Sequence, residues 1–248
     1  MPSVSIITPV HNLARYLAAT VDSVRMQSFA DWEMLLVDDC STDNSVEVAE
    51  NLARLDPRVK LIRLDRNSGA AVARNAAIKA AAGRYIAFLD GDDLWQPDKL
   101  EKQLAFMRQK NAAFSYTAYR IVDEAGKEVS VFNVPAQISY RDLLRTNVVG
   151  CSTAVYDTAG LGKVYMPDIR KRQDFGLWLR LTRTSGMAHG LPEILASYRL
   201  RSTSLSSNKL YAALYVWKLY REVEKLPLWQ SVRCFSEYAI RAFFKYYG

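Results

Sequence analysis

Short apolar runs alternate with helix-forming segments through about the first 90 residues, and this alternation constrains the fold more than any other feature. The apolar runs span residues 3–8, 32–39, 59–64 and 84–90, and the first of them, SVSIIT, is rich in β-branched residues, as buried strands are. The segments between them show helical spacing of apolar residues or many alanines, and span residues 14–27, 41–55 and 68–83. The sequence therefore predicts an α/β fold with a Rossmann-like, mostly parallel sheet and helices on both faces.

Three residues in this half mark expected helix ends. Ser41 or Thr42 is placed to cap the second helix, and Gly83 to close the third. Beyond residue 95 the alternation weakens, although residues 96–110 and 172–183 are still predicted to be helical.

The composition is that of a folded, water-soluble protein, because half of the 248 residues are hydrophobic and 24% are charged. No apolar run approaches the roughly 18 to 20 residues that a membrane span needs, and the first residues lack the basic and cleavable features of an export signal. Cys40, Cys151 and Cys234 are odd in number and widely spaced, which argues against a disulfide framework or a zinc site. We therefore expect a reducing, cytoplasmic location.

Polar residues follow each of the four predicted strands. They are TPVHN after the first, Asp38 with Asp39 after the second, DRNSG after the third, and Asp90, Gly91 and Asp92 after the fourth. Parallel strands end at one edge of a sheet, where such folds bind ligands, so we expect these residues to meet at one rim. Surface turns rich in Asp and Gly would explain any one of these clusters, but four at one rim favour a binding site.

The stretch AFLDGDDL crowds Asp90, Asp92 and Asp93 around one glycine directly after an apolar run. Like charges this close repel, and they are costly to desolvate unless a positive group lies between them. Mg²⁺ or Mn²⁺ would supply that charge, since such cations take few protein carboxylates and keep water and substrate phosphate as ligands. We expect Asp90 and Asp92 to hold the metal, with Gly91 letting a ligand approach the backbone. Asp39 is expected to accept hydrogen bonds from a base or ribose.

Four successive motifs, TPVHN, LLVDDCSTDNS, NSGAAVARNAAI and YIAFLDGDDLWQPDKL, resemble in order and spacing those of family-2 glycosyltransferases with the GT-A fold. The resemblance is close over residues 3–105 and looser to about residue 206. It implies an inverting enzyme that depends on Mn²⁺ or Mg²⁺ and moves a sugar from a nucleotide donor, expected to be UDP-linked, to a glycan hydroxyl. Many such enzymes act on lipid-linked glycans in cell-surface polysaccharide synthesis, and we expect that acceptor class here.

The same resemblance assigns the nucleotide site residue by residue. The residues implied to bind the nucleotide are Pro9, Val10, His11, Asp39, Asn67, Gly69, Arg74, Asp90, Gly91, Asp92 and Arg201. Pro9, Val10 and His11 would line the base pocket, with His11 where an aromatic ring often stacks. Asp92 would be the direct metal ligand, and Asp90 would lie nearer the ribose.

The family's second signature, [EQ]D followed by an aromatic helix, is matched by Gln173, Asp174 and Trp178 in RKRQDFGLWLRL. The resemblance makes Asp174 the general base, and the chemistry agrees, because an inverting displacement needs a carboxylate to take the proton of the acceptor hydroxyl. The alternative is that Asp174 caps its helix. Two further alternatives stay open: Asp93 as a helix-start or structural carboxylate, and Trp95 and Trp178 as pocket walls or core residues.

The sequence departs from the family pattern at Arg201. Many members carry His in a downstream YRxHxxS stretch, where it can reach the metal or diphosphate, whereas this sequence reads YRLRSTS. Arginine cannot ligate a metal, but its paired N–H groups can clamp a phosphate. We therefore expect Arg201 to stabilise the leaving diphosphate and the metal to have fewer protein ligands.

The expected division is a catalytic domain at 1–206, with a nucleotide-binding half at 1–105 and an acceptor half at 106–206, and a helical extension at 207–248. About five of the seven excess positive charges lie from residue 201 onward, and the last helix, after a break at Pro227, has a wide aromatic face. That face could pack on the catalytic domain or on a second copy in a homodimer, or meet the inner face of the plasma membrane. No nucleic-acid-binding module is recognised.

Competing functions have weaker support. The sequence lacks GxxxxGK[ST] and has no GxGxxG after its first strand, so mononucleotide kinases and dinucleotide oxidoreductases are poorly supported. A sugar-phosphate nucleotidylyltransferase usually needs a Gly-rich, basic loop after the first strand, and PVHNLARY is not one. A non-catalytic nucleotide-sugar-binding module is a third alternative, and the presence of Asp174 argues against it.

Overall fold

The alternating first half of the chain builds a parallel sheet. In the computed structural model, which describes residues 1–201 and 209–247, four parallel strands lie in the order β3-β2-β1-β4. They are β1 (Val4–Val10), β2 (Trp32–Asp38), β3 (Val59–Arg63) and β4 (Tyr85–Phe88). β1 and β2 are almost entirely buried, which is why their sequences are continuous apolar runs.

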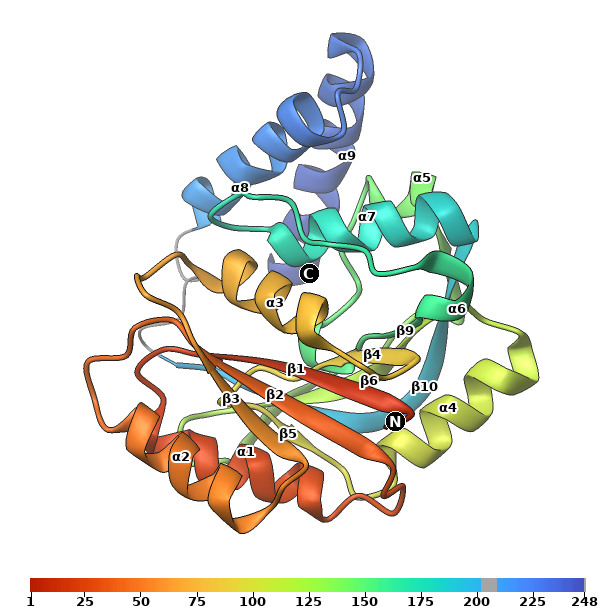
Figure 1. The fold of residues 1–248 in the computed structure, drawn as a ribbon. Coiled ribbons are helices and arrows are strands. Elements are labelled where there is room, and N and C mark those ends of the chain that lie inside the picture. Colours follow the sequence, from red (N-terminus) through yellow and green to blue (C-terminus); the bar gives the residue numbers. More distant parts are fainter. Residues whose placement is uncertain (202–208, 248) are drawn as a thin grey trace.

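Helices cover both faces of this sheet, as predicted (Figure 1). α1 (Ala14–Arg25), α2 (Ser45–Leu55) and α4 (Lys99–Lys110) lie on one face, and α3 (Ala70–Ala80) and α7 (Gln173–Ser185) lie on the other. Two hydrophobic cores result. The α1–α4 core contains Ile6, Leu17 and Leu104, and the α3–α7 core contains Phe88 and Trp178.

The second half of the chain makes the sheet mixed. β4 pairs antiparallel with β9 (Val155–Asp157), β9 with β6 (Phe114–Val122), and β6 runs parallel to β10 (Met187–Arg199). β5 (Leu94–Trp95), β7 (Glu128–Phe132) and β8 (Gln137–Ser139) add short antiparallel pairings. The remaining short elements are α5 (Tyr140–Leu143), η1 (Cys151–Thr153) and α6 (Thr158–Leu161). The α/β fold class is confirmed, and the parallel arrangement holds for the first four strands and the β6–β10 pair.

Two expected helix ends are wrong. α2 begins at Ser45 with Asn44 at its N-cap, while the Ser41 hydroxyl accepts the Asn12 N–H at 3.1 Å. α3 ends at Ala80, and Gly83 is needed for close packing, because a Cβ there would lie 2.7 Å from the Ser5 nitrogen. In both cases a contact with a distant segment decides the residue's role.

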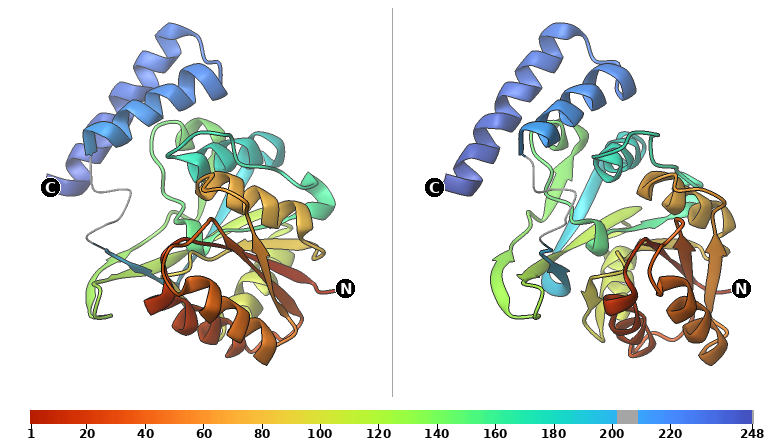
Figure 2. Two further views of the ribbon diagram at one scale, coloured as in Figure 1. Left: turned by 60° about the vertical axis from the view of Figure 1, so that its left-hand side comes forward. Right: turned by 90° about the vertical axis from the view of Figure 1, so that its left-hand side faces the viewer.

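The C-terminal extension is a pair of helices, α8 (Lys209–Lys218) and α9 (Leu228–Tyr247), joined through a π-helical turn, η2 (Leu219–Val223), and the predicted break at Pro227. Both views in Figure 2 place the pair at the end of the molecule opposite α1 and α2. The expected domain boundary at 206/207 lies outside the described residues. Along the described helices, none combines the length and apolarity needed to cross a bilayer.

Polar and aromatic contacts hold the extension against the rest of the chain. The buried Glu224 carboxylate accepts hydrogen bonds from Tyr140 and Arg183, and Tyr220 donates to the Leu144 carbonyl. On α9, Tyr238 stacks on Phe175 of α7 with ring centroids 6.2 Å apart. One face of the extension therefore packs on the chain's own core.

Candidate active site

The three crowded carboxylates of the acidic loop, residues 90–93, each have a partner within the protein. Arg74 Nη2 lies 2.5 Å from Asp90 Oδ1, and Arg201 Nη1 lies 3.0 Å from Asp92 Oδ2. Asp93 accepts the Ser152 hydroxyl at 2.5 Å. Arg74 and Arg201 therefore supply part of the positive charge that we expected from a bound cation.

Asp93 is a structural carboxylate. It is 1% exposed, and besides Ser152 it accepts the Arg199 N–H at 2.9 Å. Burial raises its pKa well above the ordinary value, and the charges of Asp92 and Asp90 raise it further. Trp95 and Trp178 are likewise buried, at 3% and 0% exposed, so both are core residues.

Asp90 and Asp92 fit a divalent cation. Each uses one oxygen in its ion pair and leaves the second without a hydrogen bond to another residue in the described parts of the chain. Burial and the charge of Asp90 raise the pKa of Asp92, while Arg201 opposes this, so a further positive charge would be favourable here. No group of three or more His, Cys, Asp or Glu side chains in those parts could hold a metal by itself. The donor set suits an ion that shares its ligands with a nucleotide.

Asp39 accepts hydrogen bonds from the loop between β3 and α3 and holds this side of the site in place. Its carboxylate accepts the Ser68 N–H at 2.6 Å and the Gly69 N–H at 2.7 Å, which fixes the turn before α3. Gly69 has φ of 87°, a conformation that favours glycine. The Asp39 carbonyl accepts Asn67 Nδ2 at 3.2 Å and lies 2.9 Å from His11 Nδ1. His11 and Asn67 are exposed around it, so three predicted base-side residues are gathered together.

The structure places Val10 and Gly91 differently from the nucleotide-binding roles predicted for them. The Val10 side chain is fully buried in the α1–α4 core, so it cannot line a base pocket, whereas Pro9 is only partly buried. Gly91 is also buried, and a Cβ on it would lie 2.8 Å from Leu13 Cδ1. Packing against the start of α1 is thus sufficient to require glycine there.

Asp174 lies in the first turn of α7, one residue after the helix begins at Gln173. The N-cap is Arg172, with φ of 63°, and no side chain caps the helix, so the capping alternative for Asp174 is not supported. Within residues 1–201 and 209–247 the Asp174 carboxylate makes no hydrogen bond or ion pair. It is partly buried and available to a ligand.

Arg74 links Asp174 to the acidic loop. Burial opposes its charge, but Asp90, Cys151 and Asp174 are close enough to keep the pKa of the guanidinium raised. The residue predicted as base and the residues predicted to hold the donor therefore share one electrostatic environment. Asp174 reaches it from α7, about 80 residues along the chain from the acidic loop.

Four residues of this region were not predicted. Ser152 and Cys151 come from η1, in a segment without clear periodicity, and the Arg199 side chain donates to the Asp92 carbonyl at 3.0 Å. Tyr16 of α1 lies under both arginines of the β10 end, with Arg199 at 5.3 Å and Arg201 at 5.4 Å from its ring centroid. No local sequence signal marks these residues, because each acts through a partner far along the chain.

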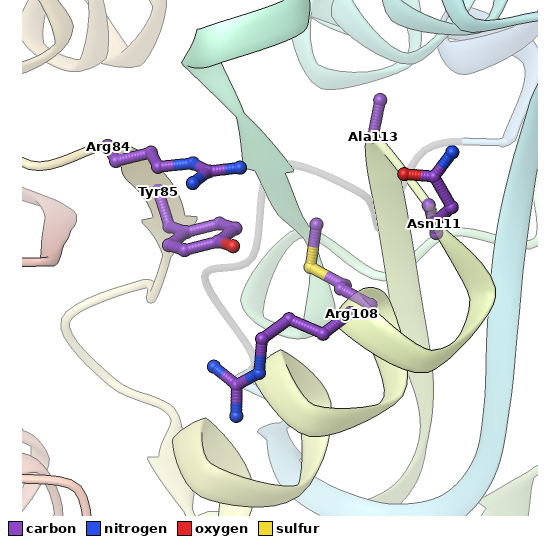
Figure 3. Close-up of a pocket in the computed structure, with 7 residues that line it drawn as sticks. Arg84, Tyr85, Arg108, Asn111 and Ala113 are labelled. Atoms are coloured by element: carbon purple, nitrogen blue, oxygen red, sulfur yellow. The ribbon is translucent and has the colours of Figure 1, made fainter.

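A cavity of about 240 Å³ lies away from this site (Figure 3). Arg84 and Tyr85, at the start of β4, line one side of it, and residues from the end of α4 to Ala113 line the other. The start of β4 is the opposite edge of the sheet from the acidic loop. None of the predicted site residues lines this cavity.

Similarity to known proteins agrees with this geometry. Residues 5–156 match the family model described as glycosyl transferase family 2. The chain is 45% identical over 242 residues to a Bacillus subtilis (strain 168) protein with the provisional name teichuronic acid biosynthesis glycosyltransferase TuaG, covering 97% of this chain and 96% of that one. It is 38% identical over 226 residues to Escherichia coli UDP-Glc:alpha-D-GlcNAc-diphosphoundecaprenol beta-1,3-glucosyltransferase WfgD, covering 91% and 88%.

Solved structures share the fold at low sequence identity. S. aureus TarS in complex with UDP-GlcNAc superposes with a TM-score of 0.74 at 22% identity, covering 98% of this chain and 73% of that one. Pyrobaculum calidifontis mannosyltransferase PcManGT, in complex with GDP-Man and Mn²⁺, superposes with a TM-score of 0.71 at 17% identity, covering 91% and 65%. These matches give no support to the nucleotidylyltransferase alternative. The chain belongs to glycosyl transferase family 2 and is a glycosyltransferase with the GT-A fold.

Proposed function

We propose that this enzyme is an inverting, metal-dependent transferase that moves a sugar from UDP to a hydroxyl of a lipid-linked glycan in cell-surface polysaccharide synthesis. The observation that carries the proposal is that the Arg74 guanidinium, bound to Asp90 at 2.5 Å, also feels the charge of Asp174. A single displacement requires the base and the donor-binding carboxylates to lie close together in one site.

Asp174 would take the proton of the acceptor hydroxyl. Its carboxylate has no hydrogen-bond partner in the described parts of the chain, so an acceptor hydroxyl could bind to it at the start of α7. The activated oxygen would attack the anomeric carbon on the side opposite the diphosphate, which inverts the configuration.

The leaving diphosphate would be held from the other side of the sugar. Arg201, now paired with Asp92, has the planar set of donors that binds phosphate oxygens in pairs. A divalent cation held by Asp92 and Asp90 would neutralise charge as it develops on the diphosphate. His11, Asn67 and Asp39 are proposed to surround the base and ribose, so most donor contacts would come from residues 1–105. Residues 106–201 would add Arg201 to the donor site and contribute to the acceptor side.

The donor and acceptor classes are proposed from the relatives. WfgD is named for UDP-Glc and a diphosphoundecaprenol-linked sugar, TuaG for teichuronic acid biosynthesis, and the TarS structure contains UDP-GlcNAc. The proposed UDP-sugar donor follows the WfgD name and the TarS structure, and the proposed polyprenyl-linked acceptor follows the WfgD name.

Thermal unfolding with nucleotide sugars tests the donor assignment. With Mn²⁺ present, saturating UDP-sugar is expected to raise the free energy of unfolding by about 3 kcal/mol at a hundred times Kd, and therefore to raise Tm by a few degrees. GDP- and dTDP-sugars at the same concentration are expected to give much smaller shifts. If no nucleotide sugar changes Tm with manganese supplied, the proposed function is wrong.

The outer face of α9 is proposed to bind the membrane surface that carries the acceptor. Trp229 and Ile240, 69% and 57% exposed, lie on this face with the half-exposed Val232. Arg233 and Arg241 are exposed beside them, which suits an interface with anionic lipid. The side chains of Phe243, Phe244 and Tyr247, which the expected aromatic face included, lie outside the described residues.

Flotation with vesicles rich in phosphatidylglycerol tests this surface. The double variant Trp229→Ala, Ile240→Ala is expected to bind at least about tenfold more weakly than the unaltered protein, because two apolar side chains no longer leave water. Leu55→Ala on α2, which removes a side chain 76% exposed on another surface, is the matched control and should bind normally. Equal binding by all three proteins, or no binding by any, would refute the assignment.

A further inference from the structure

Cys151 lies in a part of the site that has no role in the proposal above. It is the first residue of η1, and β9, which follows η1, pairs antiparallel with β4, so η1 lies beside the acidic loop. The Ser152 hydroxyl accepts the Asp90 N–H at 3.1 Å and donates to Asp93 at 2.5 Å. The position of Cys151 is therefore tied to that of the carboxylates proposed to hold the donor.

The thiol lies among the charges of the site. It is partly buried and packs against the α3–α7 core. Burial raises the pKa of Cys151 well above its ordinary value, Asp90 and Asp174 raise it further, and Arg74 opposes them. The thiol is therefore within the electrostatic range of both a donor-side carboxylate and the proposed base.

Two buried polar atoms in the same region have no hydrogen-bond partner within the described ranges. They are Arg74 Nε and Gln173 Oε1, on residues that are only 6% and 8% exposed. Gln173 precedes Asp174 in the chain, and Arg74 is bound to Asp90. An unpaired buried donor or acceptor costs about 1–3 kcal/mol, and the hydroxyl groups of a bound sugar would supply the missing partners.

We propose that Cys151 lines the subsite of the transferred sugar and contacts the sugar ring between Asp90 and Asp174. The inference rests on the proposed function, because it assumes a nucleotide-sugar donor. A thiol offers volume and apolar surface with only a weak hydrogen bond. Cys151 would thus act as a specificity-determining residue that limits the substituents the ring can carry, while Arg74 and Gln173 supply hydrogen bonds to its hydroxyls.

Protection from a small thiol reagent tests the contact in the unaltered protein. Site-resolved mass spectrometry would follow methylthiolation of Cys151 with no ligand, with UDP, and with the UDP-sugar that stabilises the enzyme. The UDP-sugar is expected to slow modification about tenfold or more at concentrations well above Kd, while UDP alone changes it by less than about twofold. Cys234, buried on α9, is the internal control and should respond to neither.

Kinetics give a second readout. Cys151→Leu adds volume and is expected to lower kcat/KM for the sugar donor about tenfold or more, with the Kd for UDP unchanged. Cys151→Ala removes volume and should shift the ratio of kcat/KM between donors with and without an N-acetyl group, whereas Cys234→Ala should not.

The outcomes separate this inference from the proposed function. If UDP stabilises the protein but the UDP-sugar protects Cys151 no better than UDP does, the sugar contact is wrong and nucleotide binding stands. The sugar contact is equally wrong if both Cys151 variants keep the kinetics of the unaltered enzyme for every donor. If no nucleotide binds at all, it is the proposed function that fails.

Discussion

Asp174→Asn is expected to lower kcat by about 10²- to 10⁴-fold, the range that general bases contribute, while leaving UDP binding intact. The amide has the shape of the carboxylate but cannot take the acceptor's proton. Since Asp174 makes no hydrogen bond or ion pair in the described parts of the chain, its replacement should leave the fold intact and change Tm little. Single-turnover transfer and UDP calorimetry on the same preparation measure the two effects.

A matched variant separates catalysis from helix stabilisation. Glu47, exposed in the first turn of α2, stands in the same relation to its helix dipole as Asp174 does to that of α7. Glu47→Gln should therefore reproduce any stability change without loss of transfer. Transfer by Asp174→Asn at the rate of the unaltered enzyme would show that another group is the base.

Asp92→Asn is expected to lower kcat/KM by about 10²- to 10³-fold, the loss typical when one group that stabilises transition-state charge is removed. The neutral amide is a poor ligand for Mn²⁺ or Mg²⁺, so the manganese-dependent part of UDP binding should disappear from calorimetric titrations. The variant also removes the ion pair between Asp92 and Arg201, but that pair is partly exposed and its loss should cost little stability.

Asp93→Asn is the control for this prediction. Asp93 is buried and holds the Ser152 hydroxyl and the Arg199 N–H, so its replacement should lower the free energy of unfolding by about 1–3 kcal/mol. Asp92→Asn, by contrast, should retain its Tm and lose its response to manganese. A fully active Asp92→Asn enzyme whose UDP binding still depends on manganese would disprove the metal assignment.

The ion pairs of the acidic loop change the role that we assign to the proposed metal ion. On the sequence alone, three carboxylates around a glycine are expected to require a bound cation. In the structure Arg74, Arg201 and Ser152 already satisfy them, and two carboxylate oxygens remain open. The proposed metal would thus act together with these ion pairs and bind the diphosphate through the open oxygens.

The sequence by itself determined the first four strands, the helices between them and the rim where their polar residues meet. These features follow from local periodicity: apolar runs need burial on both faces, and parallel strands bring their carboxyl ends to one edge. The motif order also predicted Asp174, Asp90 and Asp92 as residues of one site. In the structure Arg74 is bound to Asp90 and feels the charge of Asp174, whereas Asp92 pairs with Arg201.

Only the tertiary structure showed which residues contact each other across distant parts of the chain. Val10 belongs to a core, Gly83 and Gly91 are required by close packing, and Cys151 lies among the site charges. Ser152 and Asp93 are 59 residues apart in the chain, and Arg201 and Asp92 are 109 apart. The periodicity of the sequence indicates which face of one helix or strand is buried. Packing, burial and charge neutralisation depend instead on the residues that other helices and strands place nearby. Those neighbours are defined only when the chain has folded.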